Sequence, residues 1–158
     1  MSLGRCRSGP RTIGETVDHH PQINILDTHV WLWLMEGDPR IEAELVERFE
    51  KLAISGRLYV AAPSLWEVAS LEAAGRIRFA VPVTTWLTEA LETPGLNLLT
   101  LNPETAAESA RLPGEFAGDA VDRILIAAAR TRTGRIYTAD PDILTYAERG
   151  YVDAVRAG

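Results

Sequence analysis

The sequence is poor in cysteine and contains no long run of apolar residues. Its one cysteine, Cys6, has no partner for an internal disulfide, which argues against a small secreted scaffold. The longest apolar run, Val30 to Met35, is far shorter than the roughly 18 residues of a membrane span. Residues 1–21 lack the apolar core of a signal peptide. We therefore expect a cytoplasmic protein that makes no use of a membrane.

Several motifs of other enzyme classes are also missing. Neither G-x-x-x-x-G-K-[ST] nor G-x-G-x-x-G occurs, so nucleotide-binding folds lack their phosphate cradle. Zinc motifs such as C-x-x-C and H-E-x-x-H are absent, as is the G-x-S-x-G elbow of serine hydrolases. Lys51 is the only lysine and the net charge is −6, which is unlike a general nucleic-acid coat. A nucleic-acid enzyme stays compatible with this charge, because metal ions supply positive charge locally.

The chain has the size and composition of one soluble domain. Its 158 residues are enough to bury one hydrophobic core but hardly two. The content of 46% hydrophobic and 24% charged residues is ordinary for a soluble globular protein. Residues 1–21 are rich in Gly, Arg, Ser and His, and we expect a disordered or non-native segment there. Residues 22–158 are expected to form the single domain.

Strand-like and helix-like segments alternate along the chain. This alternation predicts an α/β domain with a mostly parallel sheet. Asp38-Pro39 favours a helix start, with Asp as N-cap and Pro at the first helical position, and residues 76–83 are left unassigned. The predicted strands are 23–26, 57–63, 96–101 and 135–140, and the predicted helices are 28–36, 39–54, 64–74, 84–92, 103–112, 119–133 and 141–149.

Five carboxylates lie where this pattern places the carboxyl ends of strands. In open parallel sheets, binding sites form outside that edge. Two of the acids end predicted strands, one lies a turn into the helix after the second strand, and two are three residues apart at the start of a helix. In chain order the five are Asp27, Glu67, Asp119, Asp122 and Asp140.

Each acid also has a purely structural interpretation. Asp27 would cap the following helix, and Ser64-x-x-Glu67 matches a capping box. Asp119 and Asp122 would be first-turn charges favoured by the helix dipole, and Asp140 a turn residue before proline. These interpretations are reasonable one at a time, but together they must explain why every cap falls at one edge of the sheet.

Clustered carboxylates repel one another unless a cation neutralises them. Oxygen ligands of this kind suit Mg²⁺, with Mn²⁺ as the alternative. A direct role for the imidazole of His29 is the less favoured interpretation of that residue.

Four motifs that contain these acids resemble those of a known family. "INILDTHVWLWL", "SLWEVA", "GDAVDRILIAAA" and "IYTADPDIL" follow one another as in PIN domains, and most closely as in VapC-type toxins of bacterial toxin–antitoxin pairs. The resemblance spans residues 22–156. It implies a three-layer α/β/α sandwich with a five-stranded parallel sheet, metal-dependent RNA cleavage, and a homodimer bound by an antitoxin.

The resemblance also implies roles for the five acids. Asp27, Glu67, Asp122 and Asp140 match the four family acids that hold the metal and serve catalysis, and Asp119 matches an additional acid of this subgroup. On this hypothesis a buried strand delivers Asp27 rigidly, as suits the near-octahedral geometry that Mg²⁺ requires. Four arginines near the acidic helix could guide RNA, although solvated surface charge is the more frequent role: Arg123, Arg130, Arg132 and Arg135.

Three other hypotheses remain open. A receiver-like signalling module would also gather acids at a parallel edge, but it would place a lysine near the last strands, where this sequence has none. A haloacid-dehalogenase-like phosphatase would place a second Asp two residues after Asp27, where His29 stands. A PIN scaffold used only for binding would not need the intact acids.

Overall fold

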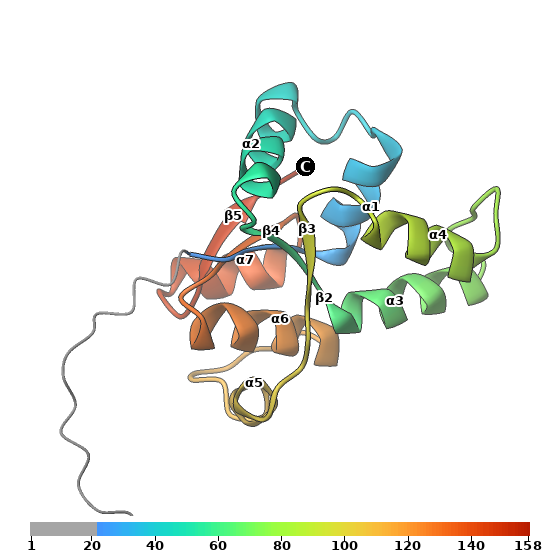
Figure 1. The fold of residues 1–158 in the computed structure, drawn as a ribbon. Helices are drawn as coiled ribbons and strands as arrows, with labels where there is room; N and C mark the ends of the chain where they lie inside the picture. Colours follow the sequence, from blue (N-terminus) through green and yellow to red (C-terminus); the bar gives the residue numbers. More distant parts are fainter. Residues whose placement is uncertain (1–21) are drawn as a thin grey trace, which may run out of the picture.

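The computed structural model describes residues 22–158, which form a five-stranded sheet between two layers of helices (Figure 1). All four strand pairings are parallel, and the order across the sheet is β3-β2-β1-β4-β5. The predicted α/β/α architecture is therefore confirmed. The expectation of a disordered segment at 1–21 lies outside the described residues. The strands are β1 (Asn24–Leu26), β2 (Leu58–Ala61), β3 (Leu96–Leu99), β4 (Arg135–Thr138) and β5 (Asp153–Arg156).

Each central strand sends successive side chains into two different cores. Ile25 and Ile136 pack into the core beneath α6 and α7, whereas Leu26 and Tyr137 pack into the core beneath α1 to α4. Side chains buried on both faces are typical of a parallel sheet covered by helices on both sides. In Figure 1, α2 lies above the sheet, α1 and α4 lie to its right, and α5 and α6 lie below it. The helices are α1 (Thr28–Glu36), α2 (Ala43–Ile54), α3 (Ala62–Ala73), α4 (Val83–Leu91), α5 (Pro103–Ser109), α6 (Ala120–Thr131) and α7 (Pro141–Glu148).

The strand order creates a switch point beside β1. The chain places β2 and β3 on one side of β1 and then returns to place β4 and β5 on the other. The carboxyl ends of β1 and β4 therefore lie side by side, with Leu26 opposite Tyr137. Crevices at such switch points are where open α/β sheets bind ligands.

The helix predicted to start at Asp38-Pro39 begins later, at Ala43, so that prediction is wrong. Asp38 instead closes a turn, in which its Oδ1 accepts the Arg40 N–H at 2.9 Å and its carbonyl accepts the Ile41 N–H at 3.1 Å. The turn carries Ile41 into the core, where its side chain is 5% exposed. Burial of this residue outweighs a local helix-start signal.

One strand differs from the sequence-based assignment. The strand β5 was not identified from the residues themselves, because it is short and two of its four residues, Asp153 and Arg156, are charged. Pairing with β4 forms it, and Arg135 Nε lies 3.0 Å from Asp153 Oδ2 across that pairing. Residues 76–82, which the sequence left unassigned, contain no helix or strand.

None of the helices within residues 22–158 has the length and apolar character required to cross a bilayer.

Gly95, between α4 and β3, provides a test of how tightly the layers pack. It has φ +79°, and a Cβ there would lie 2.3 Å from the carbonyl oxygen of Ala53 at the end of α2. Gly75 has a similar φ, +70°, but nothing lies within 4 Å of its Cβ position. We expect Gly75→Ala to lower the free energy of unfolding by about 1 kcal/mol, the cost of the left-handed conformation. Gly95→Ala should cost at least about 2 kcal/mol more, because backbone must move. If urea unfolding gave both variants the same loss in free energy of unfolding, this packing would be contradicted.

Candidate active site

Asp27 is held at the end of β1 by hydrogen bonds to both of its carboxylate oxygens. Its Oδ1 accepts the Thr28 N–H at 2.7 Å, which makes Asp27 the N-cap of α1, and its Oδ2 accepts the Thr138 hydroxyl at 2.5 Å. The side chain is 5% exposed. Burial raises the pKa of Asp27, and the two hydrogen bonds and nearby His29 oppose that rise. The capping interpretation of Asp27 is thus correct, and it leaves a buried carboxylate at the switch point.

Thr138 joins Asp27 to Asp140. Its hydroxyl donates to Asp27 and accepts the backbone N–H of Asp140 at 2.9 Å. Asp140 in turn is the N-cap of α7, because its Oδ1 accepts the N–H groups of Asp142 at 2.7 Å and Ile143 at 3.2 Å. One buried hydroxyl therefore fixes both acids at the adjoining ends of β1 and β4.

Glu67 is held by a hydroxyl rather than by a capping box. Helix α3 begins at Ala62 with no side-chain cap, so Ser64 lies inside the helix and the predicted Ser64-x-x-Glu67 capping box is wrong. The Thr28 hydroxyl donates to Glu67 Oε2 at 2.5 Å and lies 2.9 Å from Ser64 Oγ. Burial raises the pKa of Glu67, and the charges of Asp27 and Asp119 raise it further.

Asp119 and Asp122 form the capping box at the start of α6. Asp119 Oδ1 accepts the Asp122 N–H at 3.0 Å, and Asp122 Oδ2 accepts the Asp119 N–H at 3.3 Å. Asp119 is exposed and Asp122 is half-buried. Burial, followed by the charges of Asp119, Asp27 and Asp140, raises the pKa of Asp122 to about 7.

These electrostatic effects show that all five predicted acids lie in one neighbourhood. Asp140 raises the pKa of Asp27, Asp27 and Asp119 raise that of Glu67, and three acids raise that of Asp122. Asp27, Asp119 and Asp140 are helix N-caps as well, so the structural and functional interpretations do not exclude each other. The sequence does not reveal the supporting role of three hydroxyl residues, because a hydroxyl on a helix or strand gives no local signal of a distant partner. These residues are Thr28, Ser64 and Thr138.

The donor set fits a divalent cation in its chemistry. Four of the acids each keep one oxygen that accepts no hydrogen bond from the described residues: Glu67, Asp119, Asp122 and Asp140. Mutual repulsion is what a cation would relieve, and Mg²⁺ and Mn²⁺ prefer oxygen ligands. Within residues 22–158, however, no three His, Cys, Asp or Glu side chains are already drawn together as a ligand set. Binding would therefore require side-chain movement, chiefly by the acids that are not buried.

Three of the four arginines near α6 are engaged in structural contacts. Arg123 donates to the carbonyl oxygens of Ser109 and Phe116, at 3.0 and 3.2 Å. Arg130 pairs with Glu108, and Arg135 with Asp153. Arg132 is exposed at the far end of α6 from the acids. The contacts of the first three and the position of Arg132 make all four poor candidates for guiding a phosphate chain to the carboxylates.

The chain is similar to known proteins over most of the residues that the structure describes. The family model described as PIN domain matches residues 25–149. Ribonuclease VapC22 of Mycobacterium tuberculosis is 33% identical over 119 residues, which cover 73% of this chain and 85% of that protein.

Two solved structures share the fold at low sequence identity. One is VapBC2 from Rickettsia felis bound to a promoter DNA fragment, with TM-score 0.64, 12% identity, and coverage of 87% of this chain and 100% of that chain. The other is DNA-bound VapBC from Salmonella typhimurium, with TM-score 0.62, 15% identity, and coverage of 86% and 98%.

The raised pKa of Asp122 predicts how stability depends on pH. Ionisation of a carboxyl with a raised pKa disfavours the folded state, so the penalty is absent below about pH 4 and complete above about pH 7. Without metal at pH 8, Asp122→Asn should therefore raise the free energy of unfolding by roughly 1–2 kcal/mol after solvent screening, with little difference at pH 4. Urea unfolding at both pH values measures this. Glu50→Gln, at an exposed position on α2, is the control; a gain of the same size at both pH values in Asp122→Asn would contradict the prediction.

A cation at the cluster should stabilise the folded protein. Millimolar Mg²⁺ or Mn²⁺ at pH 8 is expected to raise Tm by a few degrees, because a ligand that binds the folded state shifts the unfolding equilibrium. The rise should shrink in Asp122→Asn, which loses a charge from the cluster. A Tm that stays unchanged when either metal is added at this pH would count against the site.

Proposed function

The chain belongs to the PIN domain family, and we propose that it is a Mg²⁺-dependent endoribonuclease, with Mn²⁺ as the alternative metal, that acts as the toxin of a toxin–antitoxin pair. The observation that carries this proposal is a group of five carboxylates around the adjoining ends of β1 and β4, in which Thr28 and Thr138 bond three of the acids and the negative charges raise one another's pKa. The similarity to a protein named as a ribonuclease supports RNA as the substrate.

In this proposal Asp27 and Asp122 are the central metal ligands, and Glu67, Asp119 and Asp140 complete the shell directly or through water. When bound, the cation supplies Lewis acidity, which lowers the pKa of a water molecule and offsets charge on the scissile phosphate. The chain's own contribution is placement. Thr138 orients Asp27 and fixes the backbone of Asp140, and Thr28 orients Glu67. No side chain acts as a covalent nucleophile.

The competing hypotheses have less support. The receiver-like module needs a lysine near the last strands, and the chain's single lysine, Lys51, lies in α2. The phosphatase-like site needs a second carboxylate at the position of His29, which is an exposed residue in the first turn of α1. A scaffold used only for binding leaves unexplained why the acids gather despite the electrostatic cost.

The proposed partners are an antitoxin protein and a second copy of the chain. The antitoxin would inhibit by covering Asp27, Glu67 and Asp122, for example by inserting an arginine among the carboxylates. The related solved structures are VapBC assemblies, which supports a partner of this class. Trp66, which adjoins Glu67 on α3 and is 68% exposed, is the aromatic side chain that we propose for the homodimer contact. A ribonuclease of this kind would act in the cytoplasm.

Replacing a proposed ligand should abolish cleavage and leave the fold intact. We expect Asp27→Asn, Asp122→Asn and Glu67→Gln each to lower the rate of RNA cleavage at least about 100-fold, because each removes a charge from the metal shell. Glutamine at 67 can still accept the Thr28 hydrogen bond, so stability should be retained. Asp142→Asn, in the first turn of α7 but outside the cluster, is the matched control. A variant that folds and cleaves like the unsubstituted protein would remove that residue from the proposed site.

The dimer proposal predicts a defined oligomeric state. Multi-angle light scattering of the free protein at tens of micromolar should give twice the chain mass. Trp66→Ala should shift the protein toward monomer, because exposed aromatic residues contribute strongly to interfaces. A control substitution at Ile54, which is 88% exposed at the end of α2, should leave the mass unchanged. A monomeric unsubstituted protein would refute the proposal.

A further inference from the structure

A row of three side chains leads away from the carboxylates along α1. His29 and Trp33 are four residues apart and therefore lie on the same side of the helix. Their ring centroids are 6.1 Å apart. The guanidinium carbon of Arg40, in the turn after α1, lies 4.7 Å from the centroid of the Trp33 ring. We call this row, His29–Trp33–Arg40, the α1 track.

Arg40 is held in place and yet presented to solvent. The Trp33 ring lies under its guanidinium, and Arg40 Nε is 3.2 Å from Asp38 Oδ1. Its side chain is nevertheless 60% exposed. A guanidinium oriented by an aromatic ring and a carboxylate loses less conformational freedom on binding an anion than a free arginine does.

The other end of the track adjoins the candidate active site. His29 is exposed and lies two residues after Asp27. It lies in the first turn of α1, next to Thr28, whose backbone N–H donates to Asp27 and whose hydroxyl donates to Glu67. The track thus connects the acids to a positioned cation, whereas Arg123, Arg130 and Arg135 are engaged elsewhere.

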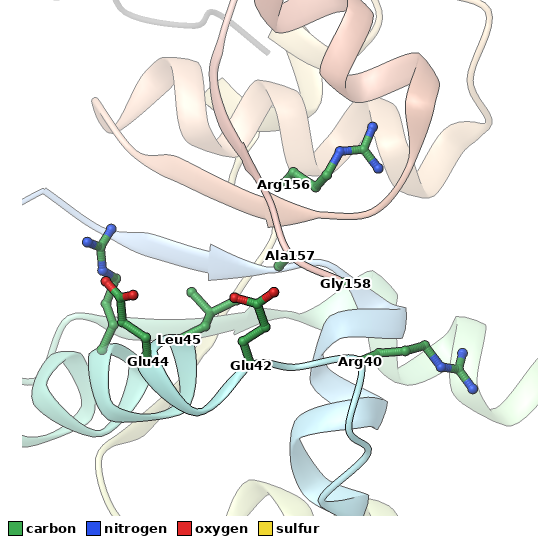
Figure 2. A pocket seen from close by; sticks show the side chains of 8 residues that line it. Arg40, Glu42, Glu44, Leu45, Arg156, Ala157 and Gly158 are labelled. Carbon is green, nitrogen blue, oxygen red and sulfur yellow. The ribbon is translucent and has the colours of Figure 1, made fainter.

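The cavity beyond Arg40 does not extend the track. It has a volume of about 350 Å³ and is lined by two further arginines, Arg48 and Arg156, but also by Glu42 and Glu44. Figure 2 shows the Arg40 side chain extending away from Glu42 and Glu44. Because the carboxylates of Glu42 and Glu44 offset the charges of Arg48 and Arg156, the cavity adds no net positive charge beyond Arg40, and the track ends there.

We propose that the α1 track binds the RNA backbone next to the cut. In this inference Arg40 contacts a phosphate with its guanidinium, and His29 donates a ring N–H to the backbone between Arg40 and the carboxylates. Trp33 is a positioning residue that acts through Arg40. The inference rests on the proposed ribonuclease function, and it names the part of the protein that holds the substrate rather than the part that cleaves it.

The test compares two arginine substitutions that remove the same charge. Arg40→Ala removes the end of the track, and Arg132→Ala removes an exposed arginine at the opposite end of α6 from the acids. The substrate is a single-stranded RNA oligonucleotide that the unsubstituted protein cleaves in Mg²⁺ or Mn²⁺. We expect Arg40→Ala to raise KM about fivefold with kcat within about twofold, and Arg132→Ala to change neither, because the phosphate contact aids binding rather than chemistry.

Salt dependence and a double-mutant cycle separate the contact from a structural effect. In the Asp122→Asn background, the affinity for the same RNA in Mg²⁺ should depend less steeply on salt after Arg40→Ala, by about 0.7 in the slope of log K against log salt. Trp33→Leu should raise KM, Trp33→Phe should retain a low KM, and the Arg40→Ala/Trp33→Leu protein should be no worse than Arg40→Ala alone. His29→Ala should raise KM, and His29→Gln, which keeps a donor, should restore it partly.

The outcomes distinguish this inference from the proposed function. If the unsubstituted protein cleaves RNA while Arg40→Ala and Arg132→Ala show equal KM values and equal salt slopes, the track is refuted and the ribonuclease function stands. If no metal condition yields cleavage of any RNA, the proposed function fails first.

Discussion

The parallel pairing of β1 with β4 is the interaction on which the candidate active site depends. The Asp27 N–H donates to the carbonyl oxygen of Tyr137 at 2.9 Å, and one residue further the Thr138 hydroxyl donates to the Asp27 carboxylate. Asp27 and Thr138 are 111 positions apart in the chain. The pairing places two strand ends, and the helix N-termini that follow them, at the same edge. Helices α3 and α6 then bring Glu67 and the Asp119–Asp122 capping box to the same neighbourhood, from opposite faces of the sheet.

The acids combine two requirements that oppose each other energetically. As N-caps, Asp27, Asp119 and Asp140 satisfy backbone N–H groups, a contribution of about 1 kcal/mol for a typical cap. Burial, and then the charges of these three acids, raise the pKa of Asp122 to about 7, so ionising Asp122 without a cation disfavours the fold. If the acids served only as helix caps, nothing would require them to lie close enough to repel one another. Their clustering therefore favours the proposed metal-dependent function.

The distribution of positive charge follows from the same constraint. A protein with net charge −6 cannot attract RNA with a broadly basic surface. Several arginines near α6 hold the structure together through carbonyl oxygens and single carboxylates. The proposed function therefore calls for cations that act locally, one from the metal and one from a side chain such as Arg40, which is held by Trp33 and Asp38.

Local patterns in the sequence determined which segments form most of the strands and helices and which acids end them. The apolar strand before Asp27, the strand before Asp140 and the start of the helix predicted at 103–112 are signals read from adjacent residues, and the structure has all three elements. Tertiary structure decided what adjacent residues cannot encode. The weakly apolar β5 exists because β4 offers an edge, and α2 starts late because Ile41 is buried. Ser64 is a partner of Thr28 rather than a cap because α3 starts two residues before it. A hydroxyl or a charged strand finds its partner only when distant segments pair, and that pairing is set by the packing of the whole chain rather than by its local sequence.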